Sequence, residues 1–444
     1  MNCALAIVGA ALLLVAMTGK TGAAEGSFAE QLARNATWQA RSAFGAYEQK
    51  YPNADNIDDR RLQGKLELSV KTESSFNSST GLVAAGFVQA GTPHDTYHGA
   101  LHRPGSTDPD SAYLDFTELY LKFSGEKGRF SAGKALIPSG LATLYSPANR
   151  FHNVDAKDPA DTRELGVWQF AYEHFLEGND SLKFAVITHA DRTKEPRNRS
   201  RWVGSSGSYE FTSVEVPAGS TLQRRFPQSG PDNFGYLLTY KAAREGMDYF
   251  VTLHHGFGAF PVLRRDNLTD LFVERVKAAT LAVGFAATRG KGFELHGEAV
   301  YQHTYHGRDQ DFARYVLGVN YDETDFAQHI GLDKIKATVE YAVEDVTGNK
   351  YDAATFSDSS NARPFKNAIL WKLQLEYDSK RSIALAQSYN LDRYDHAIVI
   401  GGEYRPRDSI SWKAVLELYN GASNTQFGRW DRNDRLVFSY THKF

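Results

Sequence analysis

This chain has almost no cysteine, no long apolar run beyond its start, and almost no net charge. The only cysteine is Cys3, so the sequence after the first two dozen residues offers no disulfide framework. After Ala24, no segment approaches the roughly 20 consecutive apolar residues of a membrane helix, which excludes a helical membrane protein. The formal net charge of -3 provides no basic field for nucleic acid, and we therefore exclude nucleic-acid binding.

Residues 1–24 predict an export signal. An apolar run from Ala4 to Met17 is followed by small residues that end at Ala24, and the run is too short to span a bilayer. The stretch before the run has no Lys or Arg, so either the start of the sequence is displaced or the signal is atypical. We expect export through the inner membrane and cleavage near Glu25.

What the chain does have is aromatic residues, 23 Tyr and 27 Phe, many at alternate positions in segments of about ten residues. In the last segment, Leu436, Phe438 and Phe444 share one face of a strand, while Ser439 and Lys443 share the other. A soluble all-β sandwich or propeller also alternates, but its dry face uses Val, Ile and Leu rather than Tyr and Trp. We therefore expect an all-β fold, a transmembrane antiparallel β-barrel of a Gram-negative outer membrane.

Short polar turns alternate with long polar loops along the chain, which predicts tight periplasmic turns and long outer loops. The count of segments gives 16 or 18 strands, because residues 60–111 hold either one or three of them. The expected organisation is a signal peptide at 1–24, an N-terminal periplasmic or plug segment at 25–60, and the barrel at 61–444. The long loops fall at about 138–164, 190–233, 257–271, 346–365 and 421–433.

The most distinctive stretch runs from Tyr113 to Asp158 and reads YLDFTELYLKF, then GRFSAGKALIPSGLATLYSPANRFHNVDAKD. It resembles the outer-membrane porin-like families that include the alginate-export barrels. In those families a Gly-Arg-Gln-like triplet and a Trp-Gly step follow a strand hairpin, and Gly133-Lys134 and Ser139-Gly140 stand in those places here. The resemblance implies an export or uptake channel.

The face opposite the aromatic residues should line the channel. Acidic and basic side chains are mixed there, and neither sign dominates. They either pair across neighbouring strands, with Glu340 and Lys372 as one candidate pair, or contact a solute. The pore-lining candidates are Glu118, Lys122, Lys183, Glu294, Glu298, Lys336, Glu340, Lys372, Glu376, Lys413 and Glu417.

Two loops and the C-terminus carry further candidates. The loop at 138–164 either folds inward to narrow the pore or is a solvated surface loop, and its candidates are Arg150, Asp155, Lys157, Asp158, Asp161 and Arg163. In the longest loop, a basic cluster either contacts lipopolysaccharide phosphates or is solvated, and it comprises Arg192, Lys194, Arg197, Arg199 and Arg201. The alternate aromatics Tyr440 and Phe444 resemble the C-terminal signal read by the barrel-assembly machinery.

The sequence therefore predicts a monomeric or homotrimeric porin-like channel for hydrophilic solutes, ions or an anionic saccharide. The alternative is a closed or plugged barrel that acts as a receptor, an adhesin or a structural protein. We expect no enzyme, because no His has a Ser, Asp or Glu partner at a spacing that fixes a catalytic geometry. We expect no cofactor and no metal site, since acidic runs such as Asp155, Asp158 and Asp161 lack the spacing of an EF-hand.

Overall fold

The structure is a computed structural model that describes residues 32–51, 57–92, 112–189, 193–194, 196, 200–203, 221–225, 230–258, 260–267, 270–348, 355–357, 359 and 363–444. The expected signal at 1–24 lies outside these residues. None of the helices in the described ranges is long and apolar enough to cross a membrane.

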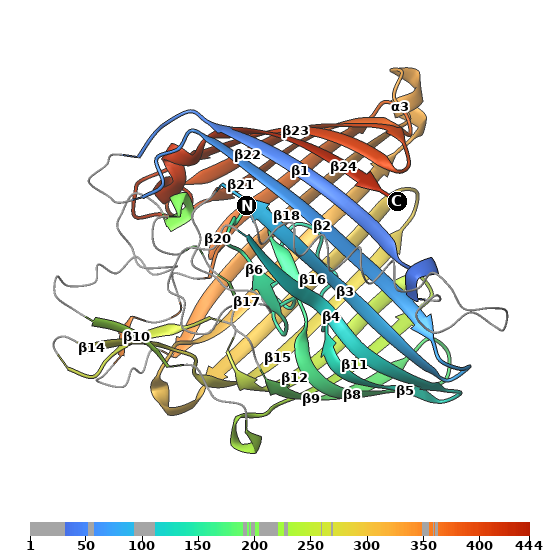
Figure 1. Cartoon of the computed structure of the whole chain (residues 1–444), viewed down its shortest axis with the longest axis vertical. Helices are drawn as coiled ribbons and strands as arrows, with labels where there is room; N and C mark the ends of the chain where they lie inside the picture. The colour runs from blue at the N-terminus through green and yellow to red at the C-terminus, as the bar shows by residue number, and fades with distance from the viewer. Residues whose placement is uncertain are drawn as a thin grey trace, which may run out of the picture.

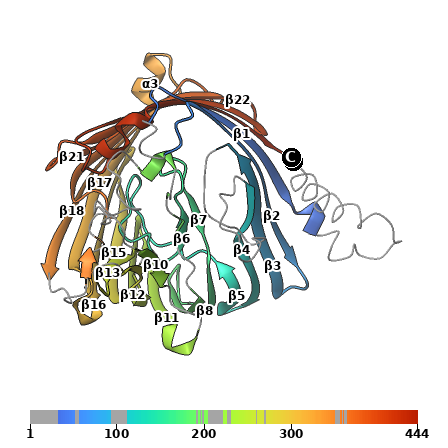
Figure 2. The same ribbon diagram turned by 60° about the vertical axis from the view of Figure 1, so that its left-hand side comes forward.

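Eighteen antiparallel strands form one closed barrel, in which each strand pairs with its neighbour in the chain and the last pairs with the first (Figures 1 and 2). In chain order these strands are β1 (Thr37–Tyr47), β2 (Leu62–Ser75), β3 (Thr80–Gly91), β4 (Ala112–Gly125), β5 (Gly128–Ala135), β8 (Val167–Phe175), β9 (Ser181–His189), β11 (Gly235–Arg244), β12 (Met247–Phe257), β15 (Lys277–Arg289), β16 (Phe293–Thr304), β17 (Asp311–Glu323), β18 (Lys334–Gly348), β20 (Asn367–Glu376), β21 (Arg381–Asn390), β22 (His396–Arg407), β23 (Ile410–Asn420) and β24 (Arg435–Lys443).

The barrel closes through β1, which lies within the segment that the sequence assigned to the periplasm or to a plug. Thr37–Tyr47 pairs with β2 on one side and with β24 on the other, with Phe44 opposite Phe438 in the register. Of the two predicted strand numbers, 16 and 18, the structure has 18, but the residues differ. The described part of 60–111 holds two strands, and the third lies upstream at 37–47.

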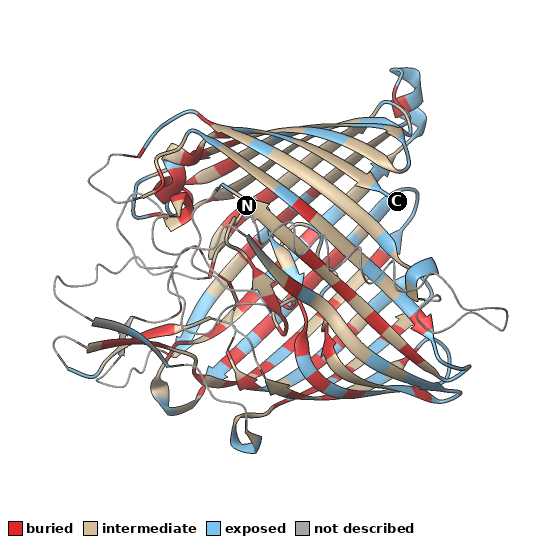
Figure 3. Cartoon of the chain, viewed as in Figure 1, coloured by how far each residue is buried: buried red, intermediate tan, exposed pale blue. Residues whose placement is uncertain are grey.

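The two faces of the wall differ as the alternation predicts (Figure 3). Trp412, Val339 and Phe438 are more than half exposed on the outer face, at 53%, 54% and 51%. On the inner face, His296 and Glu340 are both 0% exposed. Buried polar groups of this kind are stable only when they are hydrogen-bonded, so the inside of the barrel must hold partners for them.

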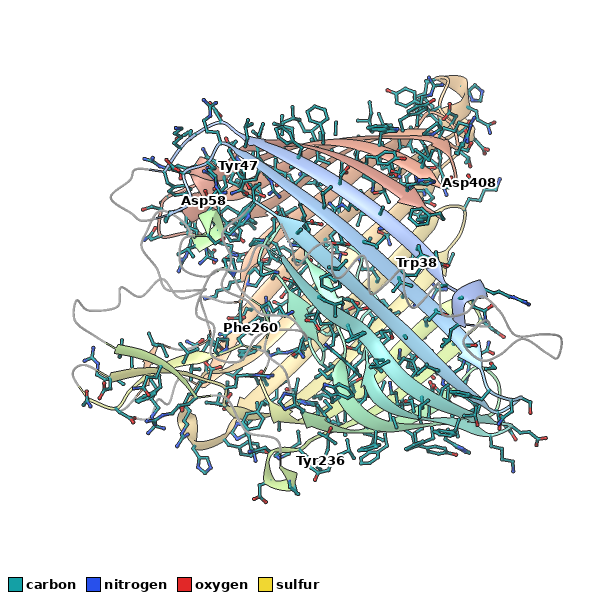
Figure 4. The ribbon with its side chains drawn as sticks, viewed as in Figure 1. Trp38, Tyr47, Asp58, Tyr236, Phe260 and Asp408 are labelled. Carbon is teal, nitrogen blue, oxygen red and sulfur yellow. The ribbon has the colours of Figure 1, made fainter. Side chains whose placement is uncertain are left out.

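The two ends of the barrel also differ. Loops at one end form a second, four-stranded sheet from β10 (Thr221–Arg225), β14 (Asp270–Glu274), β13 (Val262–Arg265) and β19 (Thr355–Ser357). Tyr47 and Asp58 lie toward this end, whereas Asp408 lies in a turn at the other end (Figure 4). Short elements complete the chain: η2 (Arg201–Val203), η3 (Pro231–Asn233), η4 (Tyr305–Gly307), α3 (Asp325–His329) and η6 (Gly428–Asn433).

Candidate functional site: a loop folded into the barrel

The loop between β5 and β8, residues 136–166, folds into the barrel, and we call it the inner loop. It carries a small hairpin of its own, β6 (Asn153–Asp155) paired with β7 (Arg163–Leu165), which Figure 2 shows inside the ring of strands. Of the two interpretations that the sequence left open for 138–164, the structure has the inward fold. Its contacts with the inner wall are of two kinds, hydrogen bonds to buried carboxylates and ion pairs.

The first carboxylate is that of Glu298, on the inner face of β16. Glu298 accepts N–H bonds from Leu141, from Ala142 at 2.7 Å and from Ala148 at 3.1 Å. It also accepts the hydroxyl hydrogen of Ser146 at 2.7 Å. The side chain is buried, so these donors replace the water that a carboxylate otherwise needs.

The second carboxylate is Glu340 on β18. It accepts N–H bonds from Thr143 at 2.7 Å, Leu144 at 2.9 Å and Tyr145 at 2.8 Å. The Nε2 atom of His296 lies 2.9 Å from the same carboxylate. Hydrogen bonds to an ionised acceptor are about twice as strong as neutral ones, so Glu298 and Glu340 together fasten the backbone of the inner loop to the wall.

Two glycines in the stretch that resembles the porin-like families have geometric roles. Gly140 has a φ of +137°, and a Cβ there would lie 2.2 Å from Ser146 Oγ and 3.1 Å from Glu298 Oε1. Gly133 has a φ of +135°, and a Cβ there would lie 2.3 Å from the Leu119 carbonyl oxygen. Only glycine allows the chain to approach these groups in this conformation.

The far side of the inner loop is held by ion pairs. Asp161 contacts Arg41 on β1 at 2.9 Å and Lys65 on β2 at 3.1 Å, and Asp158 contacts Arg435 on β24 at 2.7 Å. Burial opposes ionisation of Asp161, but the charges of Lys65 and Arg41 and the hydrogen bonds that they donate hold its pKa well below the usual range. The loop therefore bridges opposite sides of the barrel.

The other constriction candidates also lie on the inner loop. Arg150 donates to Gln302 of the wall at 2.6 Å, and Arg163 pairs with Glu67 and lies 3.8 Å from the ring of Phe87. Asp155 and Lys157 pair with each other at 3.6 Å within the loop. Four of the six candidates thus contact the wall, and two contact each other.

A space of about 360 Å³ remains between the loop and one side of the wall. Loop residues 158–161 line it, together with inward side chains of β1, β2, β22, β23 and β24. Lys413 and Glu417 from the pore-lining candidates face this space, together with Arg41 and Arg435. The lining therefore carries both signs of charge.

The eleven pore-lining candidates lie on the inner face, between residues that face outward. Glu298 and Glu340 hold the loop. Glu340 lies opposite Leu370 in the register and is therefore diagonal to Lys372, which is opposite Thr338, but the carboxylate of Glu340 bonds the loop. Most of the others contact neighbouring inward side chains: Glu417–Arg435 at 2.7 Å, Lys336–Glu376 at 2.7 Å, Glu118–Lys71 at 3.5 Å, Lys413–Glu403 at 3.7 Å, Lys122–Glu73, and Glu294 with Asn320 at 2.8 Å. Lys183 lies opposite Glu173.

The two described members of the basic cluster in the longest loop are placed differently from the prediction. Lys194 is buried and pairs with Asp115. Arg201 is 1% exposed, stacks on Tyr47 at 4.0 Å and donates to the carbonyl oxygens of Gln49 and Arg432. Neither side chain is available to a lipid phosphate, because both bond the protein itself. Arg192, Arg197 and Arg199 lie outside the described residues.

The C-terminus completes the closure of the barrel. Phe444 and Trp38 exchange N–H bonds with each other's carbonyl oxygens, both at 3.0 Å, and the Phe444 side chain is 62% exposed. Tyr440 lies opposite Ser42 in the register, and its ring centroid is 4.6 Å from that of Trp412. Both residues of the predicted assembly signal therefore lie on the same face as Trp412.

The ionisable groups form no metal centre in the part of the chain that the structure describes, where no three His, Cys, Asp or Glu side chains gather to hold an ion. Among the histidines, His296 contacts Glu340, and His303 contacts Asp311 at 2.8 Å. His94, His98 and His102 lie outside the described residues.

Solved structures with the same fold exist, although no family model and no curated protein matches this sequence. Pseudomonas aeruginosa OccD3 (OpdP) aligns with a TM-score of 0.50 at 10% identity, over 92% of this chain and 91% of that chain. Acinetobacter baumannii OccAB4 aligns with the same TM-score and identity, over 92% of this chain and 98% of the OccAB4 chain. Pseudomonas aeruginosa OccK8 (OprE) likewise scores 0.50 at 10% identity, over 92% and 97% of the two chains. The likeness shows a shared barrel fold.

Proposed function

We propose that this chain is an outer-membrane channel through which small hydrophilic solutes or ions pass down their gradient. The observation that carries the proposal is the inner loop, which is fastened across a barrel with an apolar outside and leaves a space of about 360 Å³ beside it, lined in part by charged side chains. A barrel of this size needs such a loop to sieve solutes, because its bare lumen would be wide. The fold shared with outer-membrane porins supports the proposal.

The lining favours small polar solutes and does not select for one sign of charge. Arg41, Lys413 and Arg435 line the space together with Asp161 and Glu417, so a passing molecule meets donors and acceptors of both signs. A space of this volume matches a small-molecule site. An anionic saccharide, which the resemblance of residues 113–158 suggests, fits this chemistry only as a short chain.

Planar-bilayer recording of the purified protein tests the channel. We expect stepwise currents, and a reversal potential in a salt gradient that shifts toward cations in Lys413→Glu, because Lys413 faces the space. Lys380→Glu is the matched control, since Lys380 lies in the turn between β20 and β21. Silence of the wild type above the bare membrane, or equal shifts in the two variants, would contradict the proposal.

One observation favours the closed-barrel alternative. The ion pairs of Asp158 and Asp161 join the inner loop to the wall on the side where the space remains. A receptor, adhesin or structural barrel would keep those pairs and conduct nothing. Currents that appear only when Glu298 and Glu340 are both changed to Gln would favour this alternative, whereas wild-type currents exclude it.

The proposal extends to assembly and location. Tyr440 on the last strand and the exposed Phe444 just after it would be read by the barrel-assembly machinery, and the outward aromatic rows would meet outer-membrane lipid. The chain acts on no substrate in this proposal. Light scattering of the detergent-solubilised protein distinguishes a monomer from a homotrimer.

A further inference from the structure

A second, much smaller cavity lies where the inner loop meets the wall. Its volume is about 30 Å³, and the inner faces of β8, β9, β11 and β12 close it from the wall side. Its polar lining residues are Arg150, His152 and Asn153 from the loop and Asn233, His254 and Arg275 from the wall side. No carboxylate is among the described residues that line it.

Two buried donors of loop residues that line this cavity have no hydrogen-bond acceptor among the described residues. They are Arg150 Nη1 and Asn153 Nδ2. Asn153 is 3% exposed, so bulk water does not reach its side chain. An unsatisfied buried donor costs about 1–3 kcal/mol, so this set requires an acceptor.

The cavity is also positively charged. Burial, together with the nearby Arg314 and Arg363, lowers the pKa of Arg150 to about 10, which still leaves the guanidinium protonated at neutral pH. Arg150 is thus a cation beside a cavity whose described lining residues include no carboxylate, which favours a bound negative charge.

We propose that this cavity binds one monoatomic anion, a halide such as chloride, which neutralises Arg150 and accepts from Asn153. The size decides the class, because about 30 Å³ holds a single particle of the size of a water molecule and excludes phosphate, sulfate and carboxylates. The ion ties loop residues 150–153 to β11 and β12, so it pins the base of the inner loop. It does this whether or not the barrel conducts.

Bromide and thermal unfolding test the site in the full-length protein. Crystals grown in sodium bromide should show an anomalous peak between Arg150 and Asn153. In solution, replacing gluconate by chloride at constant ionic strength should raise the unfolding temperature saturably, by about 3 °C at 100 times the dissociation constant. Sulfate, which is polyatomic, should not raise the unfolding temperature in this way at the same ionic strength.

Asn153→Asp keeps the proposal falsifiable without emptying the site, because its carboxylate supplies the missing charge internally. We expect this variant to fold, to unfold at a temperature that no longer depends on chloride, and to lose the bromide peak. Asn179→Asp adds the same charge in the turn between β8 and β9 and should keep the full chloride response. A wild type that is indifferent to chloride and shows only water density in the cavity overturns the proposal, as does an equal response in both variants.

Discussion

Changing Glu298 and Glu340 to Gln should release the inner loop. In Glu298, one carboxylate oxygen accepts the N–H groups of Leu141 and Ala142, and the other accepts that of Ala148. In Glu340, one oxygen accepts two loop N–H groups and the other accepts only that of Tyr145. An amide keeps one of the two oxygens and places an NH2 group where the other was. At least one loop N–H per site therefore loses its acceptor.

The magnitude follows from that count. Each orphaned donor costs about 1–3 kcal/mol, so the double variant shifts the loop equilibrium by about 2–6 kcal/mol. At 1.36 kcal/mol per factor of ten, the detached state gains from about 30-fold to about 10⁴-fold in relative population. Loss of the negative charges, which strengthened the remaining bonds, acts in the same direction.

Two assays read the release. In planar bilayers the double variant should give larger and noisier currents than the wild type. A Leu144→Cys probe should react faster with a thiol reagent in the double variant, and no other thiol competes once the segment with Cys3 is removed. Glu294→Gln is the control, because Glu294 shares β16 with Glu298 but bonds a wall side chain. Currents and labelling rates equal to those of the control would refute the assignment of the two carboxylates as the fastening of the loop.

Three further outcomes are expected. Gly140→Ala should destabilise the folded protein by about 1–3 kcal/mol and disturb the currents, whereas Gly178→Ala, at a positive φ with a nearest contact of 3.8 Å, should cost less and leave the currents unchanged, as thermal unfolding and bilayer recording would show. Asp161→Asn should lower the free energy of unfolding by about 1–3 kcal/mol above pH 4. Because the folded pKa of Asp161 is depressed, its contribution to stability is present above the unfolded pKa of about 3.9 and is lost as the pH falls toward the folded pKa. The difference in unfolding temperature between the wild type and the variant should therefore narrow only below about pH 4. Phe444→Ala should lower the amount of barrel in the outer membrane more than Phe438→Ala does, measured by heat-modifiable gel mobility, and an equal loss would count against a terminal assembly signal.

Much of the wall was predictable from the sequence because a membrane strand is long and strictly alternating. The strands from residue 113 onward have that pattern, with large outward side chains such as Trp412 and Val339. β1 lacks it: the outward row of Thr37–Tyr47 includes Ala40, Ser42 and Ala46, so its amphipathic signal is weak. Its place is set by backbone pairing with β24, almost 400 residues away in the chain, which periodicity cannot report.

The site was predictable only in part. Alternation predicted Glu298 and Glu340 as pore-lining residues, but in the structure they bond main-chain N–H groups of a loop, which carry no sequence signature. The two glycines at positive φ, Gly133 and Gly140, were the available signal, since each marks a close approach of the backbone. The burial of Arg201 was hidden for a similar reason, because its partners are carbonyl oxygens from distant loops.

The sheet of β10, β14, β13 and β19 joins three loops that are far apart in the chain. β10 comes from the loop before β11, β13 and β14 come from the loop before β15, and β19 comes from the loop before β20. An antibody raised against the native protein at this end would recognise a composite epitope. Synthetic peptides copied from any single loop would make poor immunogens, and a deletion in one loop would abolish binding of antibodies that contact the other two.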